Sequence, residues 1–132
     1  MQKCILIVDD SSVARSILKR ILEISGFGDS VFREANSGKV ALEILKNQAC
    51  DLIFTDLNMP DMDGKKLISR IKSSPRLNHI PVIITSSLGQ QEKQDKVLRQ
   101  AAAVFPKPLS MPEISGFLEI FKDNSRTNKD EN

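Results

Sequence analysis

Aromatic side chains are scarce in this chain, which contains no tryptophan, no tyrosine and six phenylalanines among its 132 residues. A platform on which nucleic-acid bases or sugar rings could stack therefore has little to be built from. Charge of one sign is also lacking, because 19 Lys and Arg residues oppose 17 Asp and Glu residues and leave a net charge of +2. This composition does not favour nucleic-acid binding.

Long apolar runs and metal-spaced cysteines are also absent. No run approaches the roughly 18 apolar residues that a membrane-spanning helix needs. The apolar run over residues 5–8 leads straight into two aspartates without a cleavage site of small residues, which does not match a signal peptide. We therefore expect a cytoplasmic protein. Cys4 and Cys50 lack metal-site spacing, and we expect two free, buried thiols at the starts of neighbouring strands.

The chain does have the length and apolar content of one domain. Its residues are 40% hydrophobic and 27% charged, which is typical of a globular protein with a single core. Residues 123–132 are polar and aperiodic, so we expect a domain over residues 1–122 followed by a disordered tail.

Short apolar runs alternate five times with amphipathic segments. Runs without internal polar residues are typical of parallel strands buried on both faces, and we expect strands over residues 3–8, 31–34, 51–56, 82–86 and 102–105. Helices are expected from Ser11 or Ser12 to about Ile24, from Ser37, from the Gly64 loop to about Lys72, over residues 90–99, and from Ser110. Because parallel strands require helical crossovers, the pattern predicts an α/β fold with one parallel sheet and helices on both faces.

Helical spacing also predicts which side chains point inward. In the first helix the expected inward stripe is Val13, Ile17, Ile21 and Ile24, with Leu18 and Leu22 beside it and Gly26 at the stop. In the second helix the expected inward residues are Val40, Ala41, Ile44 and Leu45.

Polar residues close the expected strands. Asp9 and Asp10 follow the first strand, Asp56 ends the third, Ser86 ends the fourth, and Lys107 comes just after the fifth. Ligands of open parallel sheets bind outside the carboxyl ends of the strands, so these groups are expected to meet there. Asp61 and Asp63 are interpreted instead as turn and cap residues.

Three carboxylates at one edge repel one another by about 4 kcal/mol per pair at 4 Å and an effective dielectric constant near 20. A hard divalent cation such as Mg²⁺ relieves this repulsion and prefers oxygen ligands. A remaining ionised carboxylate can then act as a nucleophile that forms an acyl phosphate. Lys107 and the Ser86 hydroxyl would face the oxygens of the incoming phosphoryl group.

Four segments, over residues 7–11, 56–64, 81–87 and 107–108, together resemble the receiver domain of two-component response regulators. The stand-alone CheY-like members are similar in length, and the resemblance covers residues 3–122 and so includes the predicted domain. It implies a flavodoxin-like (βα)5 fold with strand order 2-1-3-4-5. It also implies a signalling domain that catalyses its own phosphorylation and slow self-dephosphorylation.

The resemblance assigns a role to each strand-end residue. Asp56 matches the phosphoacceptor, and Asp9, Asp10, Asp56 and the backbone carbonyl of Asn58 match the Mg²⁺ ligands. Ser86 matches the switch hydroxyl, and Lys107 matches the lysine that pairs with the phosphoryl oxygens and precedes a cis proline. A histidine kinase or phosphotransfer protein is the implied donor. A downstream protein would bind the last helix-strand-helix face, which includes Lys93, Lys96, Arg99 and residues 110–122.

Some positions depart from the family pattern. Val104 stands where the family has its switch aromatic, and it is too stiff and small for the usual ring movement. Phe105 is next to it, and Pro106 removes a backbone donor. Asn58 and Leu88 match the positions that shape water access to the phosphoryl group. Since Leu88 cannot orient a water by hydrogen bonding, slow self-dephosphorylation is expected.

Alternative functions remain open at this point. The chain could be a phosphate sink or relay without output, or a degenerate receiver that no longer takes phosphate. Two other classes are a flavodoxin-like FMN carrier and a haloacid-dehalogenase-type phosphatase. Asp9 and Asp10 would repel an FMN phosphate, and they lack the two-residue spacing of the phosphatase acids.

Overall fold

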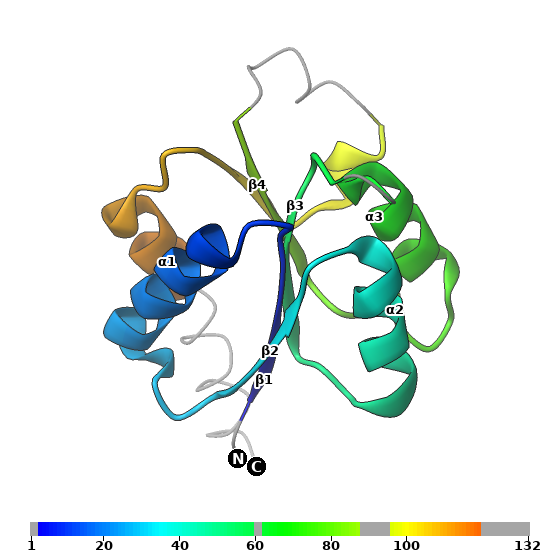
Figure 1. The fold of residues 1–132 in the computed structure, drawn as a ribbon, viewed down its shortest axis with the longest axis horizontal. Helices are drawn as coiled ribbons and strands as arrows, with labels where there is room; N and C mark the ends of the chain where they lie inside the picture. Colours follow the sequence, from blue (N-terminus) through cyan, green and yellow to red (C-terminus); the bar gives the residue numbers. More distant parts are fainter. Residues whose placement is uncertain (1–2, 60–61, 88–95, 120–132) are drawn as a thin grey trace.

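The computed structural model describes residues 3–59, 62–87 and 96–119, and its five parallel strands form one sheet in the order β2-β1-β3-β4-β5 (Figure 1). The strands are β1 (Cys4–Val8), β2 (Val31–Ala35), β3 (Leu52–Asp56), β4 (Val82–Ser86) and β5 (Ala103–Pro106). The predicted fold class and strand order are confirmed, and each strand lies within one residue of its expected bounds.

Within the described residues, helices follow four of the strands. They are α1 (Ser12–Leu22), α2 (Gly38–Asn47), α3 (Gly64–Ser73) and a helix over residues 111–119, together with a short 3-10 turn, η3 (Leu98–Gln100). The side chains of Ser11, Ser37 and Asp63 each accept a hydrogen bond from a backbone N–H of the first turn, so Asp63 is a helix cap as predicted. Asp61, residues 90–95 of the expected fourth helix and the tail over residues 123–132 lie outside the described residues.

The two faces of the sheet have separate cores. Figure 1 shows α1 and the helix over residues 111–119 on one face and α2 and α3 on the other. Alternate strand residues supply each core: Ile5, Ile7 and Phe54 pack with the first pair of helices, whereas Leu6 and Ile53 pack with the second. Every residue of β1, β3 and β4 is buried, which explains why each of these strands begins with an uninterrupted apolar run.

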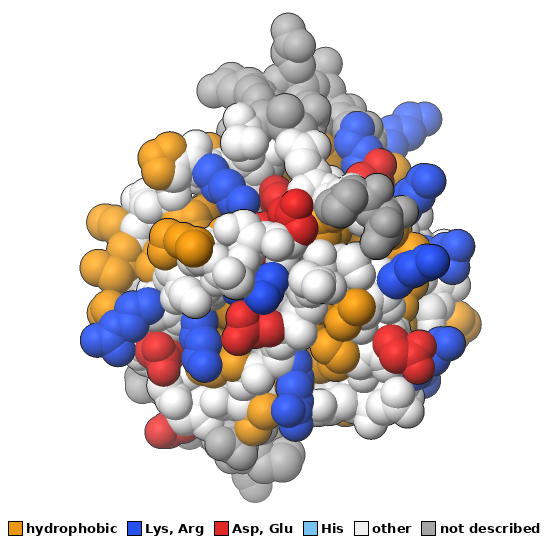
Figure 2. Space-filling view, viewed as in Figure 1, with side chains coloured by type: hydrophobic (Ala, Val, Ile, Leu, Met, Phe, Trp, Pro, Cys, Tyr) orange, Lys and Arg blue, Asp and Glu red, His pale blue; other side chains and the backbone are white. Residues whose placement is uncertain are grey.

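The predicted inward stripe of α1 is wrong. Val13, Ile17 and Ile24 are 67%, 52% and 56% exposed, whereas Leu18 and Leu22 are buried against the sheet. The helix carries two apolar stripes side by side, and only one of them can face the strands. Figure 2 shows apolar side chains on the surface at the left, over α1.

The end of α1 contributes to this difference. The helix stops at Leu22 and continues as a π-helical segment, η1 (Glu23–Phe27), in which Gly26 has a φ of 103°. Glycine adopts this left-handed conformation without the steric cost that a Cβ brings. The changed helical register places Phe27 in the core and Ile24 outside.

The inward prediction for α2 is also wrong at one position, because Val40 is 41% exposed. Ala41 and Leu45, four residues apart on the helix, are fully buried, and Ile44 is half-buried.

Among the described residues, no helix combines the length and the apolar character that crossing a bilayer requires.

Candidate functional site

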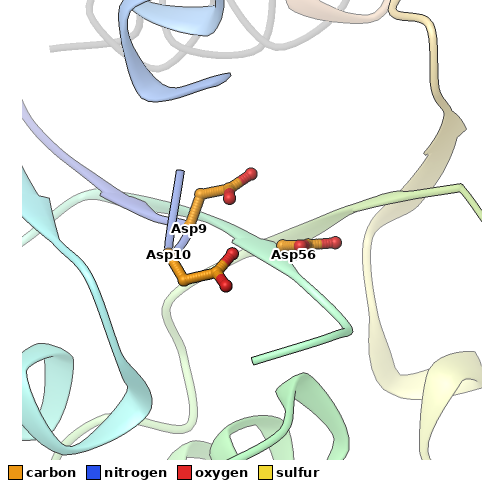
Figure 3. A group of neighbouring side chains, drawn as sticks. All are labelled: Asp9, Asp10 and Asp56. Carbon is orange, nitrogen blue, oxygen red and sulfur yellow. The ribbon is translucent and has the colours of Figure 1, made fainter. Parts of the chain in front are cut away.

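Three aspartates lie together at the carboxyl ends of two neighbouring strands. Asp9 and Asp10 follow β1 and Asp56 ends β3, and carboxylate oxygens of all three lie within 4.8 Å of one another (Figure 3). Asp9 and Asp56 are buried, at 5% and 6% exposure, and Asp10 is exposed. The sheet therefore brings together residues that lie 47 positions apart in the sequence.

Asp9 is held on three sides. Its Oδ1 accepts a hydrogen bond from the backbone N–H of Ser11 at 2.9 Å, and its Oδ2 accepts one from Lys107 Nζ at 2.9 Å. Arg15 Nη1 donates to the backbone oxygen of Asp9 at 2.7 Å, while Arg15 Nε pairs with Glu34 at 2.9 Å. The carboxylate is therefore fixed in orientation by one backbone N–H and one ammonium, while Arg15 holds the backbone of the same residue.

Asp56 retains one less-engaged oxygen. Its Oδ1 accepts a hydrogen bond from the Leu57 N–H at 2.8 Å, while Lys107 Nζ lies 3.6 Å from its Oδ2. Burial raises the pKa of Asp56 and the Asp9 charge adds to this, whereas the Lys107 charge and the N–H groups of Asn58 and Leu57 oppose it. The net direction is upward, chiefly because the carboxylate is buried.

Lys107 connects both buried carboxylates to the fourth strand. Its backbone N–H donates to the Ser86 carbonyl at 2.7 Å. Burial by itself would lower the pKa of Lys107, but the hydrogen bond to Asp9 and the charges of Asp56 and Asp9 outweigh it and raise that pKa. The lysine therefore stays charged in the site. The peptide bond between Lys107 and Pro108 is cis, as predicted.

A glycine lets the backbone of α3 approach the site closely. A Cβ on Gly64 would collide with the backbone oxygen of Asp56 and would lie 2.8 Å from Leu57 Cα. The Gly64 N–H donates to the Leu57 carbonyl at 2.8 Å, which ties the start of α3 to the residue after Asp56. Sequence reasoning missed Gly64 and also Arg15. The Asp-Gly pair at a helix start was the available signal for Gly64, whereas nothing local marked Arg15.

Ser86 is buried at the end of β4, beside the site, as expected from the sequence. By strand alternation its side chain lies on the same face as Ile84, which is opposite Val104 in the sheet register. Phe105 lies on the other face and meets the Phe117 ring edge-on, with centroids 5.8 Å apart. Phe105 therefore does not take the place of the aromatic ring that position 104 lacks.

The donor set fits Mg²⁺. Three carboxylates from two strands can supply oxygens within 4.8 Å of one another, and Mg²⁺ takes such hard ligands together with water. The raised pKa of Asp56 agrees with this, because burial and the Asp9 charge disfavour its ionised form and a bound cation would favour it. Asn58 is exposed after β3, and the role of its carbonyl stays a prediction. Leu88 and Lys93 lie outside the described residues.

A mostly apolar pocket of about 230 Å³ opens beside the cluster. Asp9, Thr85 and Lys107 line one part of it, and Ile17 of α1 and Leu109 line another. The charged cluster is therefore accessible next to an apolar surface.

The sequence matches the family model described as the response regulator receiver domain over residues 5–119. Chemotaxis protein CheY-3 of Vibrio cholerae is 37% identical over 99 residues, which is 75% of this chain and 72% of that protein. The two-component response regulator ORR5 of Oryza sativa subsp. japonica is 38% identical over 113 residues, which is 84% of this chain and 82% of that protein.

Solved structures show the same similarity in three dimensions. The signal receiver domain of a DNA-binding response regulator from Colwellia psychrerythraea superposes with a TM-score of 0.83 at 25% identity, covering 92% of this chain and 99% of that one. A response regulator receiver protein from Pseudomonas putida gives a TM-score of 0.78 at 25% identity, covering 90% and 97%.

Proposed function

Because the chain belongs to the family of response regulator receiver domains, we propose that Asp56 accepts a phosphoryl group and that the phosphorylated form controls the binding of a partner protein. One observation carries the assignment to Asp56. It is the buried carboxylate that Lys107 Nζ approaches less closely, at 3.6 Å from its Oδ2 compared with 2.9 Å for Asp9 Oδ2, while its Oδ1 accepts a backbone hydrogen bond. Asp9, by contrast, has both of its oxygens hydrogen-bonded.

Each side chain has a distinct part in the proposed transfer. Asp56 Oδ2 attacks the phosphorus, and the bond from phosphorus to the donor's leaving atom breaks. Lys107 and the Ser86 hydroxyl offer positive charge and a hydrogen-bond donor to the phosphoryl oxygens. Asp9 and Asp10, with Asp56 and the Asn58 carbonyl, would hold Mg²⁺, which when bound neutralises charge on the transferring group.

Receiver domains interact with histidine kinases or phosphotransfer proteins. We propose a protein of this kind as the donor for this chain. We also propose that the downstream partner contacts the face that carries Lys93, Lys96, Arg99 and residues 110–122. A cytoplasmic location stays a prediction. The comparisons support a receiver over the FMN carrier and the phosphatase that the sequence left open.

The central test is phosphoryl uptake from acetyl phosphate with Mg²⁺, followed by intact mass spectrometry. We expect the wild type to gain the mass of one phosphoryl group and Asp56→Asn to gain none. Asp63→Asn is the matched control, because Asn caps a helix as well as Asp does and this position is exposed. Uptake that persists in Asp56→Asn would contradict the assignment, and absence of uptake in the wild type would favour the degenerate receiver.

The lifetime of the phosphoryl group gives a second prediction. If Leu88 leaves the attacking water without a hydrogen-bond partner, Leu88→Glu should speed the decay of phosphorylated Asp56 by about 100-fold, the lower end of the range for a positioned acid or base. Decay is measured by the loss of phosphoryl mass after the donor is removed. An unchanged decay rate would count against a role for position 88.

Transmission of the signal cannot follow a ring movement at position 104. We propose that Ser86 still shifts toward the phosphoryl group and that the Val104 contacts on the α2 and α3 face change with it. This assignment is supported by the buried position of Ser86 and by the pairing of Val104 with Ile84.

A further inference from the structure

A pair of cysteines lies at the amino ends of the strands, opposite the aspartate cluster. Cys4 begins β1, Cys50 lies two residues before β3, and their Sγ atoms are 3.4 Å apart. Both are buried, at 8% and 5% exposure, and both belong to the core on the α2 and α3 face. The two thiols therefore point to the same side of the sheet and meet each other.

The backbone around the pair is locked in register. The Cys4 N–H donates to Asp51 Oδ2 at 2.8 Å, and the Asp51 N–H donates to the Cys4 carbonyl at 2.8 Å. Cys50 is thus one residue away from the position directly opposite Cys4. Neighbouring strands lie about 4.8 Å apart with a rise of about 3.3 Å per residue, so this diagonal corresponds to a Cα separation of roughly 6 Å. Disulfides most often span about that distance.

We propose that Cys4 and Cys50 form an intramolecular disulfide when the protein meets a hydroperoxide oxidant. The sulfurs need to approach from 3.4 Å to a bond of about 2.05 Å, which side-chain rotation and a small strand adjustment can supply. The bond would join the starts of β1 and β3, the two strands whose other ends carry the aspartates.

The reaction balances with hydrogen peroxide as oxidant. A deprotonated thiol sulfur attacks one peroxide oxygen, the O–O bond breaks, and a sulfenic acid and one water result after proton transfer. The second sulfur then displaces the hydroxyl of the sulfenic acid, which leaves as a second water once it takes the remaining thiol proton. Two thiols and one peroxide thus become one disulfide and two waters.

The order of the two steps follows from the hydrogen bonds around the two sulfurs. Cys4 is assigned the first step, because the hydrogen bond that Gln48 donates to its sulfur would stabilise a thiolate there. Burial raises the pKa of Cys50 to about 12. Gln48 Nε2 donates to Cys4 Sγ at 3.3 Å, which leaves the Cys4 S–H free to point at Cys50.

The test treats the full chain with hydrogen peroxide and measures intact mass and free thiols. We expect a loss of two hydrogens, no free thiols, a peptide linking positions 4 and 50, and full reversal by dithiothreitol. Oxidation should also raise the melting temperature by on the order of 10 °C, because a long loop is closed in the unfolded chain. In Cys50→Ser, a sulfenic acid on Cys4 should accumulate and be trapped by dimedone.

Three results would overturn the inference: two thiols that survive peroxide in the folded protein, disulfides only between chains, or oxygen addition without loss of the two hydrogens. Cys4→Ser is the matched variant to Cys50→Ser. It removes the proposed attacking thiol, so Cys50 should stay unreactive toward peroxide in this variant. Phosphoryl uptake is read separately on the oxidised protein. We expect it to persist, since the aspartate cluster lies at the other end of the sheet.

Discussion

At the carboxyl end of the sheet, three carboxylates lie close together, and the two buried ones pair with one lysine. At the amino end of the same strands, two buried thiols are in contact, and the carboxylate of Asp51 accepts a backbone hydrogen bond. The first arrangement holds more negative charge than its surroundings offset. The second arrangement needs no additional charge to balance it.

This difference separates chemistry from packing. Burying carboxylates close together costs folding free energy, and such a cluster persists where a cation or a phosphoryl group completes it. Neutral thiols in a core behave as small apolar groups and cost little. Neutralising a buried carboxylate at the first end should therefore stabilise the protein, whereas removing a hydrogen-bond partner at the second end should destabilise it.

The largest effect is expected at the close approach beneath the aspartate cluster. Gly64→Ala should lower the free energy of unfolding by about 3 kcal/mol, because its Cβ meets backbone atoms that cannot move aside independently. The same shift should displace Asp56 and reduce phosphoryl uptake. Urea denaturation and the mass assay measure both effects.

Gly116→Ala is the matched control for that variant. Gly116 lies within the helix over residues 111–119, and its added Cβ would meet nothing within 4 Å. We expect this change to stabilise the protein by about 1 kcal/mol through helix propensity. Equal losses in the two variants would show that the contact with Asp56 is not the cause.

A smaller effect of opposite sign is expected for Asp56→Asn without divalent cations. The variant should be more stable than the wild type at pH 7 by about 1–2 kcal/mol, within the range for replacing buried charges with neutral groups. The pKa of Asp56 is raised in the folded state above its ordinary value of 3.8, so the folded protein binds this proton more tightly than the unfolded chain. The relative stability of the wild type is therefore greatest below pH 3.8 and is lost as pH rises through the folded pKa.

Urea denaturation of both proteins across this pH range measures the difference. It should be small near pH 4 and grow toward neutral pH, and Mg²⁺ should reduce it by stabilising the wild type. A stability difference that stays constant with pH would mean that the charge of Asp56 does not destabilise the folded protein.

The smallest effect is expected at the amino end. Asp51→Ala removes the acceptor for the Cys4 N–H and should cost about 1 kcal/mol, the usual net value of one hydrogen bond. Phosphoryl uptake should be unchanged, because the aspartate cluster lies at the opposite end of the strands. A loss of phosphoryl uptake would show that the two ends of the sheet are coupled, and that they do not behave independently.

The strands were predictable because burial on both faces of the sheet requires uninterrupted apolar runs, which are easily recognised in the sequence. Ile5–Val8 and Val82–Ile84 have no internal polar residue, and each lies within a strand as expected. The inward face of α1 was not predictable in the same way. Val13 and Ile17 have the same helical spacing as Leu18 and Leu22, and only the docking of the helix on the sheet decides which pair is buried.

The site residues were predictable as a set because each strand-end position carries a polar group. Asp9, Asp56 and Lys107 lie together as the sequence indicated. Arg15 and Gly64 were missed, because their contacts are with backbone atoms of residues that the sequence does not mark as their partners.

By itself, the amino-acid sequence determined the alternation of strands and helices and the chemical types gathered at the strand ends, because periodicity and residue type are local properties. Only the tertiary structure decided which carboxylate oxygen stays less engaged, which stripe of α1 faces water, and that two cysteines 46 residues apart touch. Those outcomes depend on distances across the sheet, and such distances are set when the elements pack rather than when they form.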